Sequence, residues 1–404
     1  MKEQKTTSSQ AEAQSRVWNT SFLDTITYEN FQYQGRVLYV GYISPSQRRD
    51  LNPFAKILRL VAYDTNDKHM IWERTFIYEE NDMSVYATIA FRLKVVDSIL
   101  YVFGDMTNGV SASWLFALDA QSGQDIWQHK GPGGTNMTIG HGIVFLRDTQ
   151  LHALDGKTGQ HLWSYAHMDK RDSLENALAV TSDAVFLMGA SLDMENANTF
   201  VRCLHLSSGE ERWNMQLNSM RSLFTFKSLL ATENTIFAVT NSMKTGADVV
   251  YALQAQNGAL RWTSQEGIYS QPLLVTEDVL YLSRYEYVTE LNTLTGELLR
   301  TRELKGEGSG QYNFYTLPDH EVYGCELMGT LSAFDIPNSK IRWSASKSLP
   351  LSIGTHITID KKSVYMTTME QDEIVALDRE TGVEQQYLQS KNDKGEIIQI
   401  IAVG

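Results

Sequence analysis

Apolar and polar residues alternate over short stretches of this chain, and one such stretch recurs with the same turn and the same ending. In Leu151–Trp163, LHALDGKTGQHLW, alternating apolar residues precede an aspartate, and a second short run ends on tryptophan. Alternation with a period of two is typical of a strand with one buried face, and the intervening Lys157-Thr158-Gly159 is typical of a tight turn. The stretch therefore predicts a β-hairpin.

Eight copies of this stretch follow one another, and we align them on the position of Asp155, here called the anchor. The copies are LVAYDTNDKHMIW, LFALDAQSGQDIW, LHALDGKTGQHLW, VRCLHLSSGEERW, VYALQAQNGALRW, VTELNTLTGELLR, LSAFDIPNSKIRW and IVALDRETGVEQQ. Six have Ala two residues before the anchor, six have Gly four residues after it, and six end in Trp eight residues after it. The repeated positions that we interpret as structural are Asp64, Trp72, Asp119, Gly123, Trp127, Asp155, Gly159, Trp163, Gly209, Trp213, Gly258, Trp262, Gly296, Asp335, Trp343, Asp378 and Gly382.

Each repeated residue type has a physical reason. An anchor carboxylate accepts backbone N–H bonds in the turn, and Gly supplies the positive φ that the turn needs. The small Ala leaves room for a large neighbour, and a Trp buried between sheets contributes apolar area while its indole N–H reaches a backbone acceptor. The repeat is therefore interpreted as a packing motif, and Trp114, outside its register, is expected to contribute less to stability than Trp163.

The spacing of the copies predicts the architecture. Consecutive anchors lie 36 to 55 residues apart, which is the spacing of propeller blades and not of short solenoid coils. Further strand-like segments precede several copies, at Val85–Phe91, Ile99–Gly104, Asn136–Ile139, Ile143–Leu146, Leu223–Leu230, Thr235–Val239, Ile268–Val275 and Val279–Leu282. Four antiparallel strands per repeat predict an all-β fold, a single eight-bladed β-propeller, with seven blades as the alternative.

The propeller is expected to occupy residues 15–404 as one domain, after a flexible polar leader at residues 1–14. Two segments are candidates for closing the ring: SRVW, which ends at Trp18, and the β-like run Glu396–Val403. Closure removes exposed strand edges, which would otherwise pair with other chains. Of the two, we favour the N-terminal segment around Trp18, joined to the last blade.

The copies resemble the PQQ-type repeat, the tryptophan-docking motif A-x-D-x-x-T-G-x-x-x-W, over essentially residues 15–404. One branch of that superfamily comprises quinoprotein dehydrogenases that bind pyrroloquinoline quinone and Ca²⁺. The adjacent cysteine pair typical of that branch has no counterpart here, because Cys203 and Cys325 stand alone. The chain is more similar to the non-enzymatic, BamB-like branch, which implies a scaffold or sensor that binds a protein or peptide in the bacterial cell envelope. A quinoprotein dehydrogenase or another small-ligand-binding propeller is the alternative.

Charge and hydropathy narrow the choice of partner. The formal net charge is −13, which argues against a nucleic-acid-binding surface, since phosphate neutralisation needs clustered Lys and Arg. No apolar run reaches the ~18 residues that a membrane span needs, and the N-terminus lacks the apolar core of a secretory signal. We expect a monomer outside the cytoplasm, with a cytoplasmic location as the alternative.

No catalytic, cofactor or metal site is predicted. Ser-His-Asp sets, G-x-S-x-G, H-E-x-x-H and Walker motifs do not occur. His141, His152 and His161 fall in one repeat, but spacing fixes no complete ligand set, so we interpret them as strand-face residues. The segment Gly306–Gly310 precedes a strand, which favours a flexible loop over a phosphate cradle. Whether Cys203 and Cys325 form a disulfide is left open.

Three long inserts are the candidate binding loops. They span residues 41–57, 189–200 and 240–248, and each is expected to join the second and third strands of its blade. Equivalent connections share one rim of a propeller, and long loops on a rigid scaffold often carry binding function.

Overall fold

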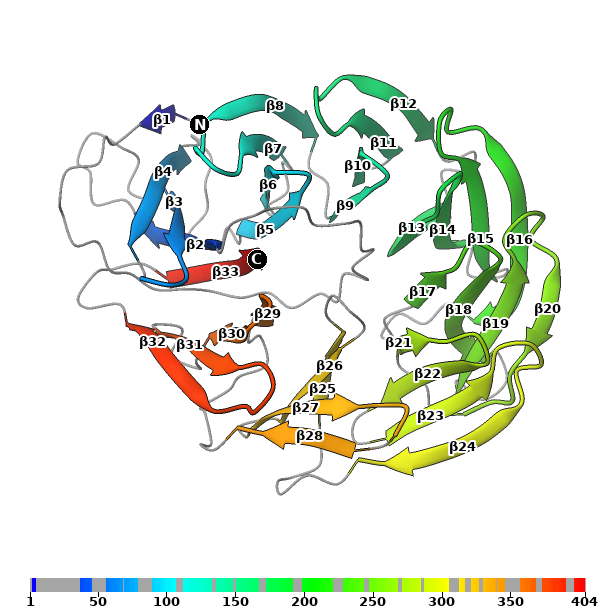
Figure 1. Ribbon diagram of the computed structural model, residues 1–404. Coiled ribbons are helices and arrows are strands. Elements are labelled where there is room, and N and C mark those ends of the chain that lie inside the picture. Colours follow the sequence, from blue (N-terminus) through cyan, green and yellow to red (C-terminus); the bar gives the residue numbers. More distant parts are fainter. Residues whose placement is uncertain are drawn as a thin grey trace.

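All regular elements among the residues that the computed structural model describes are β-strands, and they form a closed ring of eight antiparallel blades (Figure 1). The described residues are 2–4, 37–45, 56–67, 69–78, 89–106, 112–132, 136–147, 150–166, 172–191, 198–220, 228–242, 247–267, 271–284, 287–304, 312–316, 321–326, 330–338, 340–345, 357–367, 373–389 and 396–403. None of them belongs to a helix with the length and apolar character needed to cross a membrane.

The blades follow one another in chain order. Blade one contains β33 (Glu396–Val403), β2 (Val37–Pro45), β3 (Lys56–Asp64) and β4 (Met70–Tyr78). Blades two to four contain β5 (Ile89–Val96), β6 (Ile99–Met106), β7 (Ala112–Asp119), β8 (Asp125–Pro132); β9 (Asn136–Gly140), β10 (Ile143–Arg147), β11 (Gln150–Asp155), β12 (His161–Ala166); and β13 (Asp172–Val180), β14 (Ala184–Ser191), β15 (Asn198–His205), β16 (Glu211–Met220).

Blades five to eight have the same order of strands. They contain β17 (Ser228–Ala231), β18 (Thr235–Ser242), β19 (Asp248–Gln254), β20 (Leu260–Thr263); β21 (Gln271–Val275), β22 (Val279–Arg284), β23 (Tyr287–Asn292), β24 (Leu298–Glu303); β25 (Tyr312–Thr316), β26 (Val322–Glu326), β27 (Leu331–Asp335), β28 (Lys340–Ser344); and β29 (Ile357–Ile359), β30 (Ser363–Thr367), β31 (Glu373–Asp378), β32 (Glu384–Gln389). Blades four and five are also joined by two residue pairs between β16 and β18.

The predicted eight-bladed fold is confirmed, and the seven-blade alternative is excluded. Every copy of the repeat forms the hairpin between the third and fourth strands of a blade. Of the predicted strand Val85–Phe91, residues 89–91 lie in β5, which continues to Val96. Residues 85–88 lie outside the described part. The three long inserts do connect second and third strands, at β2–β3, β14–β15 and β18–β19.

The ring is closed by the C-terminal strand, so the preference for the segment around Trp18 was wrong on this point. β33 pairs antiparallel with β2 along its whole length, from Val37 opposite Val403 to Ile43 opposite Glu396. Its sequence EIIQIIAV is rich in the β-branched residues that favour strands, and its pairing with β2 removes the free inner edge of blade one. Trp18 itself lies outside the described residues. Within the expected leader, β1 (Lys2–Gln4) pairs with β4 and adds a fifth strand at the rim.

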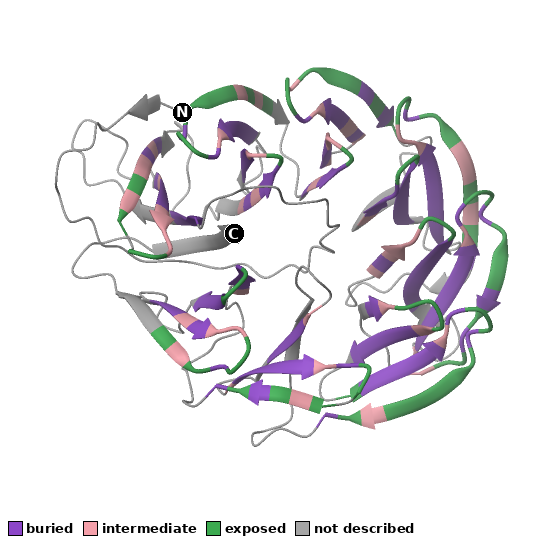
Figure 2. Ribbon diagram, in the orientation of Figure 1, coloured by how far each residue is buried: buried purple, intermediate pink, exposed green. Residues whose placement is uncertain are grey.

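The hydrophobic core is divided among the interfaces between blades. Eight clusters of buried residues are present among the described residues, one for each pair of adjacent blades, including the pair of blades eight and one. Figure 2 shows the second and third strands largely buried, while the outermost strands carry most of the exposed positions. The ring therefore derives its stability from contacts between neighbouring blades.

One tryptophan contact recurs at six of these interfaces. The indole of Trp163 donates to the carbonyl oxygen of Leu206 in the next blade at 2.9 Å, and its ring lies against Gly209. Gly209 has a φ of +72°, and a Cβ there would lie 2.4 Å from the indole. The other five indole donors and their acceptors are Trp72 to Ala120, Trp127 to Gly156, Trp213 to Ala255, Trp262 to Thr293 and Trp343 to Arg379.

A small residue on the neighbouring strand accommodates each indole. Ala153 is the register partner of Trp163, and Cys203 is that of Trp213. Ala153 and Cys203 are fully buried. A larger side chain at this position would compete with the ring for space, because protein interiors are close-packed.

The anchor carboxylate closes the turn against which the indole packs. Asp155 accepts hydrogen bonds from the backbone N–H of Thr158 at 2.8 Å and from its hydroxyl at 2.7 Å. These two bonds lower the pKa of Asp155, because they favour its ionised form. Asp378 makes the equivalent bonds to Thr381, and its pKa is lowered for the same reason.

Trp114 is buried as deeply as the repeat tryptophans, which the alignment did not predict. It is 8% exposed, against 6% for Trp163. Its ring stacks on Phe76 of blade one at 6.2 Å and lies over Gly104. Trp114 therefore belongs to the packing between blades one and two, although it stands outside the repeat.

Replacement of Trp163 by Ala should lower the free energy of unfolding by about 3–5 kcal/mol, because it leaves a cavity between blades three and four. Thermal and denaturant unfolding would measure the loss. Leu162→Ala is the control, since Leu162 is the exposed neighbour in the same strand and should change stability by no more than about 0.5 kcal/mol. Equal losses in the two variants would contradict this account of the contact.

Acid should weaken the turn at Asp155. A carboxyl with a lowered folded-state pKa contributes stability above its unfolded pKa of about 3.9, and the contribution is lost as pH falls through the folded value. Asp155→Asn keeps an acceptor oxygen but does not titrate. The decrease in melting temperature between pH 7 and pH 3 should therefore be smaller in the variant than in the parent chain; an equal or larger decrease would count against the role assigned to the carboxylate.

Candidate functional site

Two interfaces lack the tryptophan contact: blade six with blade seven, and blade eight with blade one. Copy six ends on Arg300, and copy seven has Ser339 in place of Gly. Copy eight ends on Gln386, and copy one has Lys68 in place of Gly. Tryptophan in one copy and glycine in the next are thus lost together. This coupling is visible in the sequence, but counting each position separately missed it.

Between blades six and seven, a hydrogen bond from Arg302 takes the place of the tryptophan contact, and ion pairs within blade six hold the arginine in place. Glu290 occupies the Ala position, is 3% exposed and is the register partner of Arg300. The Nε of Arg300 contacts its Oε2 at 2.7 Å, and Arg302 forms a second ion pair with Glu290. Arg302 also donates to the carbonyl oxygen of Ile336, one residue after the anchor, at 3.2 Å. At the six interfaces that have the tryptophan contact, the carbonyl oxygen of this same position accepts the indole N–H.

The hairpin that carries this ionic contact is unusually apolar on its exposed side. Nine large apolar residues are exposed in the described part of the chain, and four of them lie in β23, β24 and their turn. Leu299 is 48% exposed and Leu298 is similar. The four are Tyr287, Leu294, Leu298 and Leu299, which we call the blade-six patch. Leu294, Leu298 and Leu299 lie in or beside the turn, and Tyr287 lies at the far end of the hairpin, opposite Glu303. Several exposed apolar residues on one hairpin favour an interaction site.

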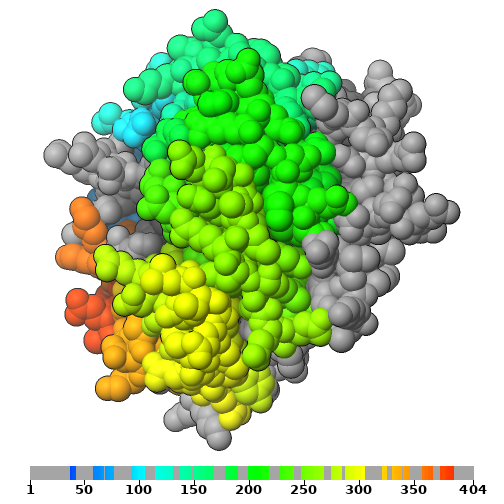
Figure 3. Space-filling model, turned by 90° about the vertical axis from the view of Figure 1, so that its right-hand side faces the viewer, coloured from blue at the N-terminus to red at the C-terminus, as the bar shows by residue number. Residues whose placement is uncertain are grey.

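The outermost strand of blade six, β24, lies on the outer rim of the ring in Figure 1, and the outermost strands of blades four to six face the viewer in Figure 3. β24 is the last strand of its sheet, and no described strand pairs with its outer edge. By contrast, the outer edge of β4 pairs with β1, through Lys2 opposite Ile77 and Gln4 opposite Thr75. The rim of this propeller is therefore a place where an additional strand is accommodated.

The histidines of blade three are only partly brought together. The Nδ1 of His152 and the Nε2 of His161 both contact the hydroxyl of Ser164, at 2.8 and 2.7 Å. The ring centroids of His152 and His161 are 6.3 Å apart. His141 lies in the turn between β9 and β10 with a φ of +49° and does not share this contact. Sequence reasoning missed His129 of β8, whose imidazole is close enough to both rings to interact electrostatically.

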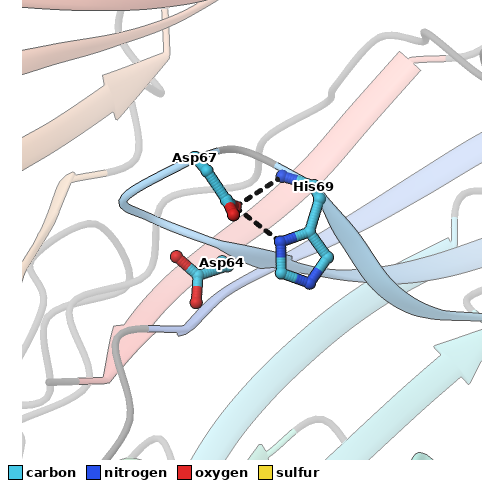
Figure 4. A group of neighbouring side chains, drawn as sticks. All are labelled: Asp64, Asp67 and His69. Atoms are coloured by element: carbon cyan, nitrogen blue, oxygen red, sulfur yellow. Dashed lines mark hydrogen bonds and ion pairs between the residues drawn. The ribbon is translucent and has the colours of Figure 1, made fainter.

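A second group with metal-ligand chemistry lies in the β3–β4 turn of blade one. Ligand atoms of Asp64, Asp67 and His69 all lie within 4.8 Å of one another (Figure 4). The Nδ1 of His69 is 2.5 Å from Asp67, which raises the pKa of His69 and lowers that of Asp67. Asp64 accepts the backbone N–H of Asn66. Asp67 and His69 are exposed and form an ion pair with each other. We therefore interpret the group as part of the turn and not as a metal site.

Among the remaining candidates, the structure describes Cys203, which is not a reactive site. Cys203 is a free, buried thiol, and burial raises its pKa to about 12, so it stays protonated and unreactive at neutral pH. This answers the open question of a disulfide for Cys203. The segment Gly306–Gly310 and most of the three long inserts lie outside the described residues.

Comparison with known proteins agrees with the geometry. The model of the family described as outer membrane protein assembly factor BamB matches residues 9–186, 96–222 and 147–386. The chain belongs to this family. The resemblance to a PQQ-like repeat propeller of the BamB-like branch is thereby confirmed. None of the curated proteins is similar enough in sequence to count as a relative.

Solved structures share the BamB-family fold with low sequence identity. BamB from Moraxella catarrhalis is 17% identical, with a TM-score of 0.53 over 83% of this chain and 94% of that one. AztD from Citrobacter koseri is 11% identical, with a TM-score of 0.58 over 91% of this chain and 98% of that one. At these identities the two structures are evidence for the fold alone.

Removal of Glu290 should be costly, because Glu290→Ala leaves two arginines without their buried partner. Because the Arg300 side chain is 53% exposed and that of Arg302 is 17% exposed, solvent screens part of the freed charge, and the free energy of unfolding should fall by less than the about 3–5 kcal/mol of a fully buried pair. The triple variant Glu290→Ala, Arg300→Trp, Ser339→Gly rebuilds the contact found at six other interfaces and should recover most of that loss in unfolding experiments. A triple variant less stable than Glu290→Ala alone would show that the two kinds of contact are not interchangeable.

Proposed function

We propose that this protein is a non-catalytic propeller scaffold of the bacterial cell envelope that binds an extended segment of a protein partner at the rim of blade six. The blade-six patch is the observation that carries the proposal. It combines four exposed apolar side chains with an outer edge of β24 that no described strand pairs with.

An extended peptide fits this surface for two reasons. The free edge of a sheet offers a row of N–H and C=O groups, so an added strand gains main-chain hydrogen bonds. Side chains of the added strand then contact Leu298 and Leu299, and burial of apolar surface contributes about 25 cal/mol per Å² before the cost of association. The partner segment is therefore expected to be rich in apolar and β-branched residues.

Family membership supports the role and the compartment. The family description names an outer-membrane assembly factor, which is a role in the envelope and in contact with other proteins. A propeller suits this role because its rigid blades hold a docking edge in place, and little conformational entropy is lost on binding. The acidic chain, with a net charge of −13, remains a poor nucleic-acid binder.

Binding should depend on Leu299. We expect Leu299→Asp to lower recovery of the partner from envelope extracts at least about tenfold, because a charge placed against the apolar segment must be desolvated. Ile126→Asp is the matched control: Ile126 occupies the same repeat position in blade two and is 44% exposed. Both variants are first shown to melt at the same temperature as the parent chain. The amount of partner that each recovers is then compared with that of the parent chain by quantitative affinity capture.

Equal recovery with Leu299→Asp and Ile126→Asp would place binding elsewhere on the ring. The quinoprotein alternative is tested in the same preparation by addition of pyrroloquinoline quinone and Ca²⁺. A non-catalytic scaffold should show no saturable spectral change, whereas a stoichiometric change would contradict the proposal.

A further inference from the structure

In blades one and three, the residue ten positions after the anchor reaches across to a carboxylate of the next blade. In blade one this residue is Arg74, which contacts Asp125 of blade two at 2.7 Å and is itself 2% exposed. In blade three it is Tyr165, which donates to Glu211 of blade four at 2.6 Å. Asp125 and Glu211 both stand six positions after the anchor of their own copy. The repeat thus builds a second polar contact between neighbouring blades.

Between blades two and three, the same two positions are both histidine. They are His129 and His161. His152, three positions before its anchor, corresponds to Arg202 of blade four, whose guanidinium contacts Tyr165 at 3.2 Å. The repeat geometry therefore brings three imidazoles to one interface. At the interfaces of blades one and two and of blades three and four, one of these positions is a carboxylate and another donates to it. Between blades two and three, none of the three positions is a carboxylate.

Two of the imidazoles already point at one atom. The hydroxyl of Ser164 lies 2.8 Å from the Nδ1 of His152 and 2.7 Å from the Nε2 of His161. With ring centroids 6.3 Å apart, an approach on the order of 1 Å would let both nitrogens bind one ion at the ~2.0–2.1 Å typical of Zn²⁺–imidazole bonds. His161 and Ser164 are exposed, so this approach needs only side-chain rotation.

We propose that His129, His152 and His161 form a binding site for a divalent transition-metal ion, of which Zn²⁺ is the representative, at the interface between blades two and three. Three imidazoles leave a fourth position for the Ser164 hydroxyl or for water. An ion held there links β8 of one blade to β11 and β12 of the next, so binding should also stabilise the ring.

Isothermal titration calorimetry of the full chain with ZnCl₂ tests the site directly. We expect one Zn²⁺ per chain at this site, and His152→Ala and His161→Ala should each weaken its binding at least about tenfold. His141→Ala is the matched control from the same blade and should bind like the parent chain. Zn²⁺ should raise the melting temperature of the parent chain and of His141→Ala, but not of His152→Ala.

Three outcomes would overturn the proposal: no Zn²⁺ binding by the parent chain, unchanged binding in both His152→Ala and His161→Ala, or binding abolished only by Asp67→Asn with His69→Ala. The last of these would locate the ion in the β3–β4 turn of blade one. None of them bears on partner binding at blade six, which has its own test.

Discussion

The ring depends on one contact, in which an indole lies on a glycine of the next blade and donates to the carbonyl that follows that blade's anchor. Trp163, Gly209 and Leu206 make it between blades three and four. The contact needs a residue with positive φ and no Cβ, a small residue beneath the ring and a turn closed by its own side chains. These requirements explain why the repeat is so regular, and why its Asp, Gly and Trp are better understood as packing residues than as an active site.

The blade interface at which this contact is replaced is the one that points to a function. Between blades six and seven, the indole is replaced by a hydrogen bond from Arg302, which pairs with Glu290 inside blade six, and the same hairpin exposes Leu298 and Leu299. Burial of an ion pair offers little net stability compared with well-packed apolar groups. A selective reason for retaining it would be that function is located at this blade. Between blades two and three, the tryptophan contact is retained and the accompanying polar pair is instead a set of histidines.

The fold could be predicted almost entirely from the sequence, because a strict repeat makes each blade a test of the others. The coupling of Trp in one copy with Gly in the next was also readable, but only by comparing neighbouring copies. Other features depend on packing that no single repeat encodes. The closing strand is β33 because its pairing with β2 covers an inner edge, and Trp114 is buried because Phe76 of another blade stacks on it. The nearness of His129 to the histidines of blade three becomes evident only when the two blades are placed side by side, and the blade-six patch requires knowledge of exposure.

Amide hydrogen exchange of the full chain, with and without its bound partner, tests the central claim most directly. An added strand at the rim of blade six should slow exchange in β24, at Leu298–Glu303, while the equivalent strand of blade two, Asp125–Pro132, exchanges as in the free chain. Protection that spares β24, or that affects both strands equally, would contradict the proposal that a partner binds where the tryptophan contact has been replaced.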